Sequence, residues 1–175
     1  YNLSSFQNAI ANSTDYDDAL QSMSWADGNS EDMFFQLAIE DIQDTADLFL
    51  PLYKQSGGTD GFVSLEVSPK LAYDSQGTIE QAHKLWKAVN RPNLMIKIPA
   101  TREGLAAIRQ TIAAGLNINV TLIFSVERYA EVMEAYLSGL EDRVERGMEI
   151  SDINSVASFF VSRVDSKIDH ALEKM

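Results

Sequence analysis

The alternation of strands and helices is the feature that most constrains the fold of this chain. Four short apolar segments, at residues 61–67, 94–98, 118–124 and 155–161, have the composition of buried strands. Apolar residues at helical spacing predict helices at 31–50, from Thr78 to Val89, from about 102 to Gly115, from Ser125 through Leu137, and from about Asp165. A strand followed by a helix, repeated four times, is typical of a parallel sheet with helical crossovers.

Polar residues within the strands favour a closed barrel over an open doubly wound sheet. Both faces of an open sheet meet helices, so its strands are apolar on both sides. Here each strand has one polar side, whereas residues such as Ile118, Val120 and Leu122 are expected to face helices. The sequence therefore predicts an α/β fold of the TIM (β/α)8 barrel class, with the active site at the carboxyl ends of the strands. The polar side is carried by Ser64, Glu66, Lys97, Asn119, Thr121 and Ser158.

Local signals predict where several helices begin and end. Ser30 and Ser125 are predicted N-caps, and Thr78 with Gln81 fits a capping box. Gly115 is the predicted stop of the helix that begins near residue 102.

Lys97 is the residue with the most specific chemistry, because charged amines are rarely buried without a partner. Burial favours a neutral amine, which can attack a ketone and form a Schiff base. Glu66 is predicted to move protons through a water, Thr121 to hold that water or orient the amine, and Asn119 to bind substrate hydroxyls. The residues alone leave other readings open. The Lys97 amine can instead reach solvent, Glu66 can be an ion partner, and Thr121 and Asn119 can simply fill the barrel.

Composition excludes several classes of function. The net charge of −12 argues against nucleic acid as a partner, since binding phosphates needs a basic face. No apolar run is long enough to cross a membrane, and no signal peptide is visible at YNLSSFQNAI. The chain has no cysteine, and His83 and His170 have no metal-ligating neighbour at suitable spacing. We therefore expect a cytoplasmic protein that needs neither a metal nor a membrane.

The segments GFVSLEVSP, RPNLMIKIPAT, NVTLIFS and SVASFFVSRVD resemble the strand motifs of transaldolase in order and approximate spacing. The resemblance covers nearly the whole chain and is strongest to the bacterial type, found alone or fused to phosphoglucose isomerase. It implies a cofactor-free enzyme of the pentose phosphate pathway. Such an enzyme moves a dihydroxyacetone unit from sedoheptulose 7-phosphate to glyceraldehyde 3-phosphate. It also implies that Lys97 is the Schiff-base lysine and that Glu66 and Thr121 handle the catalytic water.

The same resemblance assigns the residues that bind substrate. Asn119 and Ser158 are implied to bind the dihydroxyacetone part, Arg163 to bind phosphate, and Phe160 to line the site. Asn2 corresponds to a further family asparagine, although Leu3 stands where the family has proline.

The chain also departs from the family pattern. No residue matches the family's first-strand aspartate, and the motifs of strands seven and eight are not found. Residues 1–175 are therefore expected to be a single but incomplete barrel domain, about strands 2 to 6 with their helices. Unpaired strand edges favour self-association of such a chain. Two alternative functions remain, an inactive self-associating barrel fragment and a related Schiff-base aldolase that acts on fructose 6-phosphate.

Overall fold

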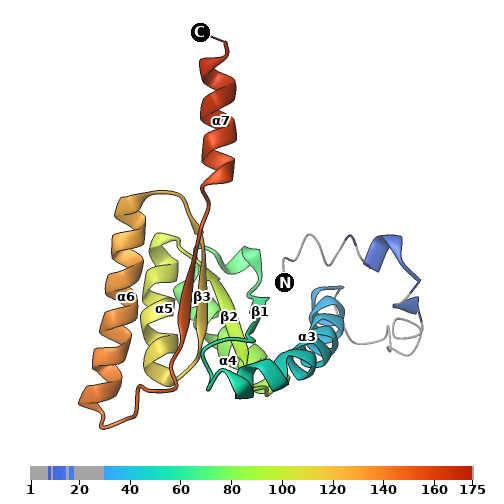
Figure 1. Cartoon of the computed structure of the whole chain (residues 1–175), viewed down its shortest axis with the longest axis vertical. Coiled ribbons are helices and arrows are strands. Elements are labelled where there is room, and N and C mark those ends of the chain that lie inside the picture. The colour runs from blue at the N-terminus through green and yellow to red at the C-terminus, as the bar shows by residue number, and fades with distance from the viewer. Residues whose placement is uncertain (1–7, 9, 15, 18–29, 175) are drawn as a thin grey trace. The chain divides into compact units, whose positions relative to one another are not determined.

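The computed structural model describes residues 8, 10–14, 16–17 and 30–174 (Figure 1). Each of the four predicted strand segments contains one strand, so the predicted alternation is confirmed. In chain order the elements are α3 (Ser30–Gln55), β1 (Val63–Glu66), the 3-10 helix η1 (Pro69–Leu71), α4 (Ser75–Val89), β2 (Leu94–Pro99), α5 (Arg102–Ala114), β3 (Ile118–Ile123), α6 (Val126–Glu145), β4 (Ser155–Phe159) and α7 (Ser162–Leu172).

The four strands form one sheet in the order β1-β2-β3-β4. β3 and β4 run parallel, with Ile118 opposite Ser155 and Val120 opposite Ala157. This is the α/β arrangement with parallel neighbours that the sequence predicts. The chain divides into two compact units, each described here by itself. One holds the described residues up to Glu66 and His83–Ile96, and the other holds Val67–Ala82 and the described residues from Lys97 onward.

In the first unit, one buried asparagine ties a helix to the start of a strand. The Asn93 side-chain nitrogen donates to the carbonyl oxygens of Ala46 and Gly61, at 2.9 Å each. The backbone of Gly61 passes so close to α3 that an added Cβ would lie 2.7 Å from the nitrogen of Tyr53. Phe49 has the helical spacing from Ile42 and Ala46 that would place it in the core, but it is 45% exposed near this turn. The buried side chains of α3 are those of Phe35, Leu37, Ala38, Ile42 and Ala46.

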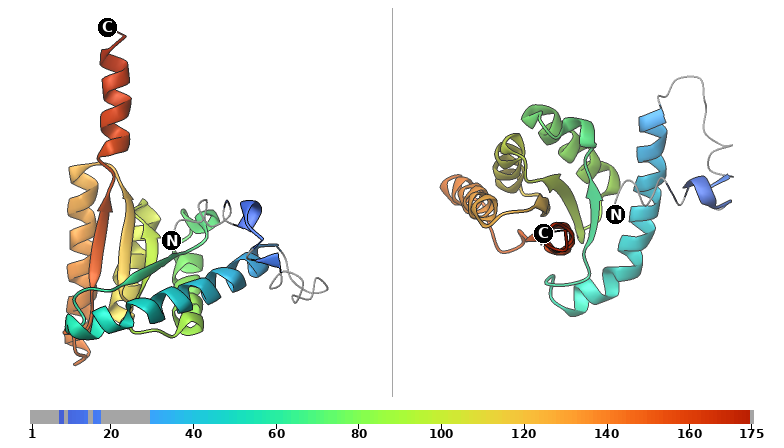
Figure 2. Two further views of the ribbon diagram at one scale, coloured as in Figure 1. Left: turned by 45° about the vertical axis from the view of Figure 1, so that its right-hand side comes forward. Right: turned by 90° about the horizontal axis from the view of Figure 1, so that it is seen from above.

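In the second unit, α5 and α6 pack side by side and both contact β3 (Figure 1). A glycine permits the close approach, because a Cβ at Gly139 would lie 2.8 Å from the Arg109 carbonyl oxygen and from Ile112. α7 continues beyond the carboxyl end of β4, and none of its described side chains is buried (Figure 2).

Helix ends show where the local signals hold and where they fail. The Ser125 hydroxyl accepts from the Arg128 backbone at 3.1 Å, and Gly115 ends α5 in the left-handed region with φ 98°, so both predictions are confirmed. The capping box at Thr78 is wrong, because α4 begins at Ser75. The Thr78 hydroxyl instead donates to the Leu71 carbonyl at 3.0 Å. The start of α4 is instead capped by Asp74, whose carboxylate accepts from the backbone of Gly77 at 3.0 Å.

The side-chain alternation of β3 changes near its carboxyl end. A register irregularity lies between Val120 and Ile123, where Leu122 has a φ of 59°. Leu122 is 39% exposed and Ile123 is fully buried, so the prediction that Leu122 faces the helices is wrong. An extra residue in one strand of a pair bends that strand and re-aims the side chains that follow.

Arg143 is a buried cation that holds the end of α6 to the end of α5. Its guanidinium donates to the carbonyl oxygen of Glu149 at 2.9 and 3.0 Å, and to that of Ala113 at 3.2 Å. A Cβ at Gly115 would lie 2.7 Å from this guanidinium, so the glycine leaves room for it as well as ending α5.

We expect Arg143→Met to lower the free energy of unfolding by about 2–4 kcal/mol, because two carbonyl groups lose a charged donor in a buried place. Arg146→Met, at an exposed position on the same turn, is the matched control. Urea unfolding of both variants tests the expectation. Equal stability of the two variants would show that the contacts of Arg143 contribute nothing.

Candidate functional site

Lys97 is the half-buried position in an otherwise buried strand. Its neighbours Ile96 and Ile98 are fully buried, and β2 is buried at every other residue from Leu94 to Pro99. The Lys97 carbonyl oxygen accepts from the backbone of Val67 at 3.1 Å, which fixes the backbone at this point. Because successive side chains point to opposite faces, the lysine emerges on the face opposite to its two isoleucine neighbours.

Asn119 and Ser158 lie on the same face of the adjacent strands β3 and β4. The Ser158 hydroxyl donates to the side-chain oxygen of Asn119 at 2.9 Å. Thr121 follows Asn119 by two residues and is only 1% exposed. Its hydroxyl has no hydrogen-bond partner among the described residues. Three polar side chains of the predicted site are thus carried by neighbouring strands, and one of them has an unused donor and acceptor.

Two aromatic rings and an arginine follow the carboxyl ends of β3 and β4. The rings of Phe124 and Phe160 stack with centroids 5.3 Å apart and planes inclined by 22°. The Arg163 guanidinium carbon lies 4.4 Å from the centre of the Phe160 ring. The structure therefore brings Phe160 and Arg163, both predicted from the sequence, into direct contact.

Glu66 and Asn2 complete the set of predicted residues. Glu66 is the last residue of β1, is half-buried, and belongs to the first compact unit. Asn2 lies outside the described residues, so its predicted role stays a prediction.

Phe124 is the residue that sequence reasoning missed. It is the last residue of the predicted strand INVTLIF, and regular alternation along that strand turns it toward the helices. The signal that could have found it is the repeated pattern of a polar strand end followed by phenylalanine, in NVTLIFS and SVASFFVS. Phe124 follows the predicted site residue Thr121 by three positions, and Phe160 follows Ser158 by two.

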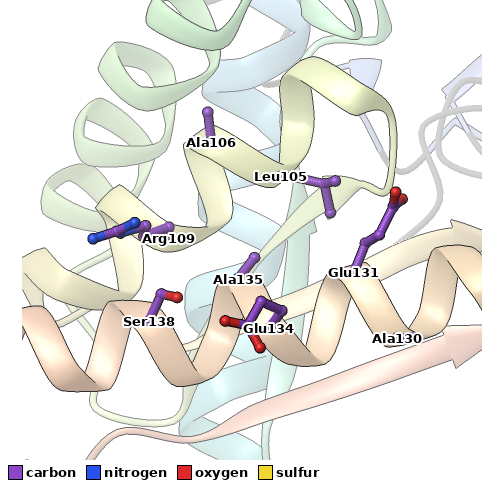
Figure 3. Close-up of a pocket in the computed structure, with 8 residues that line it drawn as sticks. All are labelled: Leu105, Ala106, Arg109, Ala130, Glu131, Glu134, Ala135 and Ser138. Carbon is purple, nitrogen blue, oxygen red and sulfur yellow. The ribbon is translucent and has the colours of Figure 1, made fainter.

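A groove on the outer surface of α5 and α6 contains none of the predicted site residues (Figure 3). At its edge, Arg109 binds Asp142 through two hydrogen bonds of 2.8 Å. Hydrogen bonding to Arg109, and to a smaller extent the positive charge of Arg109, hold the pKa of Asp142 below the usual 3.8. The groove is lined by Leu105, Ala106, Arg109, Ala130, Glu131, Glu134, Ala135 and Ser138.

A lowered carboxyl pKa makes stability depend on pH in a defined direction. The pair stabilises the folded state above the unfolded value of 3.8, and this contribution is lost as pH falls through the lower folded pKa. We expect Asp142→Asn to lower the melting temperature slightly near neutral pH and not at all in strong acid. Asp152→Asn, also on the surface, is the control. Thermal melts between neutral pH and about pH 2 test this, and a difference that persists in acid would contradict it.

Among the described residues, no helix is both long enough and apolar enough to cross a membrane, and no group of three acidic or histidine side chains could hold a metal ion.

Comparison with known proteins assigns the chain to a family. Residues 2–175 match the family described as transaldolase/fructose-6-phosphate aldolase. A transaldolase of Saccharopolyspora erythraea is 51% identical over 170 residues, which are 97% of this chain and 46% of that protein. Transaldolases of Arthrobacter sp. and Mycobacterium ulcerans are 49% and 47% identical, over 98% and 99% of this chain and 46% and 47% of theirs. The chain thus spans about half the length of these curated relatives. It belongs to the transaldolase/fructose-6-phosphate aldolase family, and its parallel α/β sheet is part of that family's TIM barrel.

Proposed function

We propose that the protein containing this chain is a transaldolase. It would transfer a dihydroxyacetone unit from sedoheptulose 7-phosphate to glyceraldehyde 3-phosphate, giving erythrose 4-phosphate and fructose 6-phosphate. The observation that carries the proposal is Lys97, a lysine set between fully buried isoleucines in β2. The high identity to proteins named transaldolase supports the same reaction.

The proposed chemistry begins at the amine of Lys97. Its Nζ attacks the ketone carbon of the donor sugar and water leaves, which forms an iminium. The iminium accepts the electron pair of the neighbouring carbon–carbon bond as that bond breaks, while the hydroxyl on the far carbon loses its proton and an aldehyde departs. The enamine that remains attacks the acceptor aldehyde, and water then releases the product and the amine.

The other predicted residues supply positioning and proton transfer. Glu66 would carry protons to and from the water that leaves and returns. The buried Thr121 hydroxyl, which has no partner among the described residues, would hold that water. Asn119, already hydrogen-bonded to Ser158, would bind the hydroxyls of the dihydroxyacetone unit. Arg163 would bind the substrate phosphate, as a fixed fork of donors suited to phosphate oxygens.

Borohydride trapping tests the proposal. Reduction in the presence of fructose 6-phosphate should add one three-carbon unit to the protein, and peptide mass spectrometry should place it on Lys97. An adduct on another lysine, with Lys97 unmodified, would refute the assignment.

The family description also names fructose-6-phosphate aldolase, and this gives the alternative function. A transaldolase keeps the three-carbon unit bound until an acceptor aldehyde arrives, whereas an aldolase releases free dihydroxyacetone. Steady release of dihydroxyacetone from fructose 6-phosphate without an acceptor would favour the aldolase.

The extent of the domain, self-association and location belong to the proposal as well. Residues 1–175 would form part of one barrel domain, and a chain of these residues alone would self-associate. Two observations support this: β4 is at the edge of the described sheet, and Val156 within it is 47% exposed. Light scattering of the 175-residue chain tests it, and a monomer would refute it. A cytoplasmic location stays a prediction from the sequence.

A further inference from the structure

Phe124 has no role in the proposed reaction, although it lies against two residues that do. Phe124 is 47% exposed in this chain, which spans about half the length of its curated relatives. One face of the ring stacks on Phe160, and Phe160 in turn carries the guanidinium of Arg163. The three side chains form a continuous stack that ends in a positive charge.

The irregularity in β3 is what turns Phe124 toward this stack. Ile123 lies opposite Phe159, and Phe159 packs edge to face on Tyr129 of α6, with ring centroids 5.9 Å apart. These residues are therefore on the helix side of the strands. Phe124, the next residue, lies on the other side with Phe160. Regular alternation from Ile118 would place Phe124 with the helices, so the bulge at Leu122 is required for the stack.

The backbone on both sides of Phe124 is held in place. The nitrogen of Phe160 donates to the carbonyl oxygen of Ile123 at 2.8 Å, which fixes the spacing of the two chains where the rings begin. Immediately after Phe124, Ser125 caps α6 by accepting from the backbone of Arg128. The stacking ring thus stands on a short segment anchored at its strand end and its helix end.

We infer that Phe124 is a positioning residue for phosphate recognition. Its ring fixes Phe160, and Phe160 fixes the guanidinium of Arg163 through a cation–π contact. An arginine on an exposed segment loses side-chain entropy when it binds an anion, and a stack that already restricts it lowers this loss. The inference rests on the proposed function in one respect, the assignment of Arg163 to the substrate phosphate.

Calorimetric titration with inorganic phosphate tests the inference without relying on turnover. Phe124→Leu keeps an apolar side chain and removes the stacking ring, and we expect the Kd for phosphate to rise roughly five- to tenfold. Phe124→Tyr keeps the ring and should stay within about twofold of the wild type. In kinetic assays, Phe124→Leu should raise KM for glyceraldehyde 3-phosphate and change kcat much less, since binding alone is affected.

Two further variants separate positioning from stability and from the proposed function. Phe159→Leu removes a neighbouring ring that packs on the helix side, so it should cost stability and leave phosphate affinity unchanged. An equal loss of phosphate affinity in Phe159→Leu and Phe124→Leu would overturn the inference, as would wild-type affinity in Phe124→Leu. Unchanged phosphate affinity in Arg163→Ala would also overturn the inference, because phosphate would then bind without Arg163. Schiff-base trapping with unphosphorylated dihydroxyacetone reports on Lys97 separately, so failure of the proposed function would show there.

Discussion

Arginine in place of Lys97 should abolish turnover and prevent any covalent adduct with substrate. The guanidinium group stays protonated in proteins and has no lone pair to attack a ketone, whereas an amine on the same backbone position can lose its proton. Lys97→Arg keeps a positive charge between the same two buried isoleucines, so the fold should survive. A coupled activity assay and borohydride trapping, read by peptide mass spectrometry, measure the two effects.

Lys70→Arg is the matched control for this experiment. Lys70 is exposed in η1, four residues after the end of β1. This variant tests whether replacing a different lysine near a strand end also lowers turnover. The control should retain wild-type turnover and a full adduct on Lys97. If Lys97→Arg still forms the three-carbon adduct, another amine is the nucleophile and the proposed chemistry must move to it.

The strands were predictable because their signal is local. The run LMIKI is short, mostly apolar and bounded by Pro92 and Pro99, and its length and flanking prolines favour a buried strand over a helix. Lys97 was also informative, because Ile96 and Ile98 on either side of it point to one face of the strand and Lys97 must therefore point to the other. The fold class followed from the order of such segments, and the family match confirms it.

Contacts between distant segments set the limits of prediction. Thr78 fits the spacing of a capping box, but its hydroxyl bonds to the carbonyl of Leu71, and the helix begins three residues earlier, where Asp74 accepts from the backbone of Gly77. Phe49 keeps the spacing of a core residue but is exposed where the backbone of Gly61 approaches α3. The local pattern at one residue therefore does not decide its role, because a nearby cap or an approaching segment changes the surroundings of the side chain.

The bulge in β3 shows the same limit at the candidate site. Period-two alternation predicted the faces of Asn119 and Ser158, which are joined by a hydrogen bond. It failed three residues later, because the extra residue at Leu122 is defined only by pairing with β4. The extra residue places Phe124 on the same face as Phe160. Regular alternation therefore predicts the face of Phe160 correctly and that of Phe124 wrongly.

Glutamine in place of Glu66 should slow the chemistry far more than it weakens substrate binding. The amide has the shape of the carboxylate but cannot accept a proton, and we expect kcat to fall roughly 10²-fold or more, with KM little changed. Both formation and hydrolysis of the Schiff base need this proton transfer. The adduct on Lys97 should therefore still form under borohydride, but over a longer time.

Ser64→Ala is the matched control, because Ser64 lies two residues earlier on the same face of β1 and carries no titratable group. It should retain most of the wild-type rate. A second variant, Glu66→Ala, leaves room for a small carboxylate, and added formate should restore part of the lost rate if Glu66 transfers protons. A carboxylate that only balances the charge of a lysine would give near-normal turnover in Glu66→Gln and no response to formate, and Glu66 would then be an ion partner.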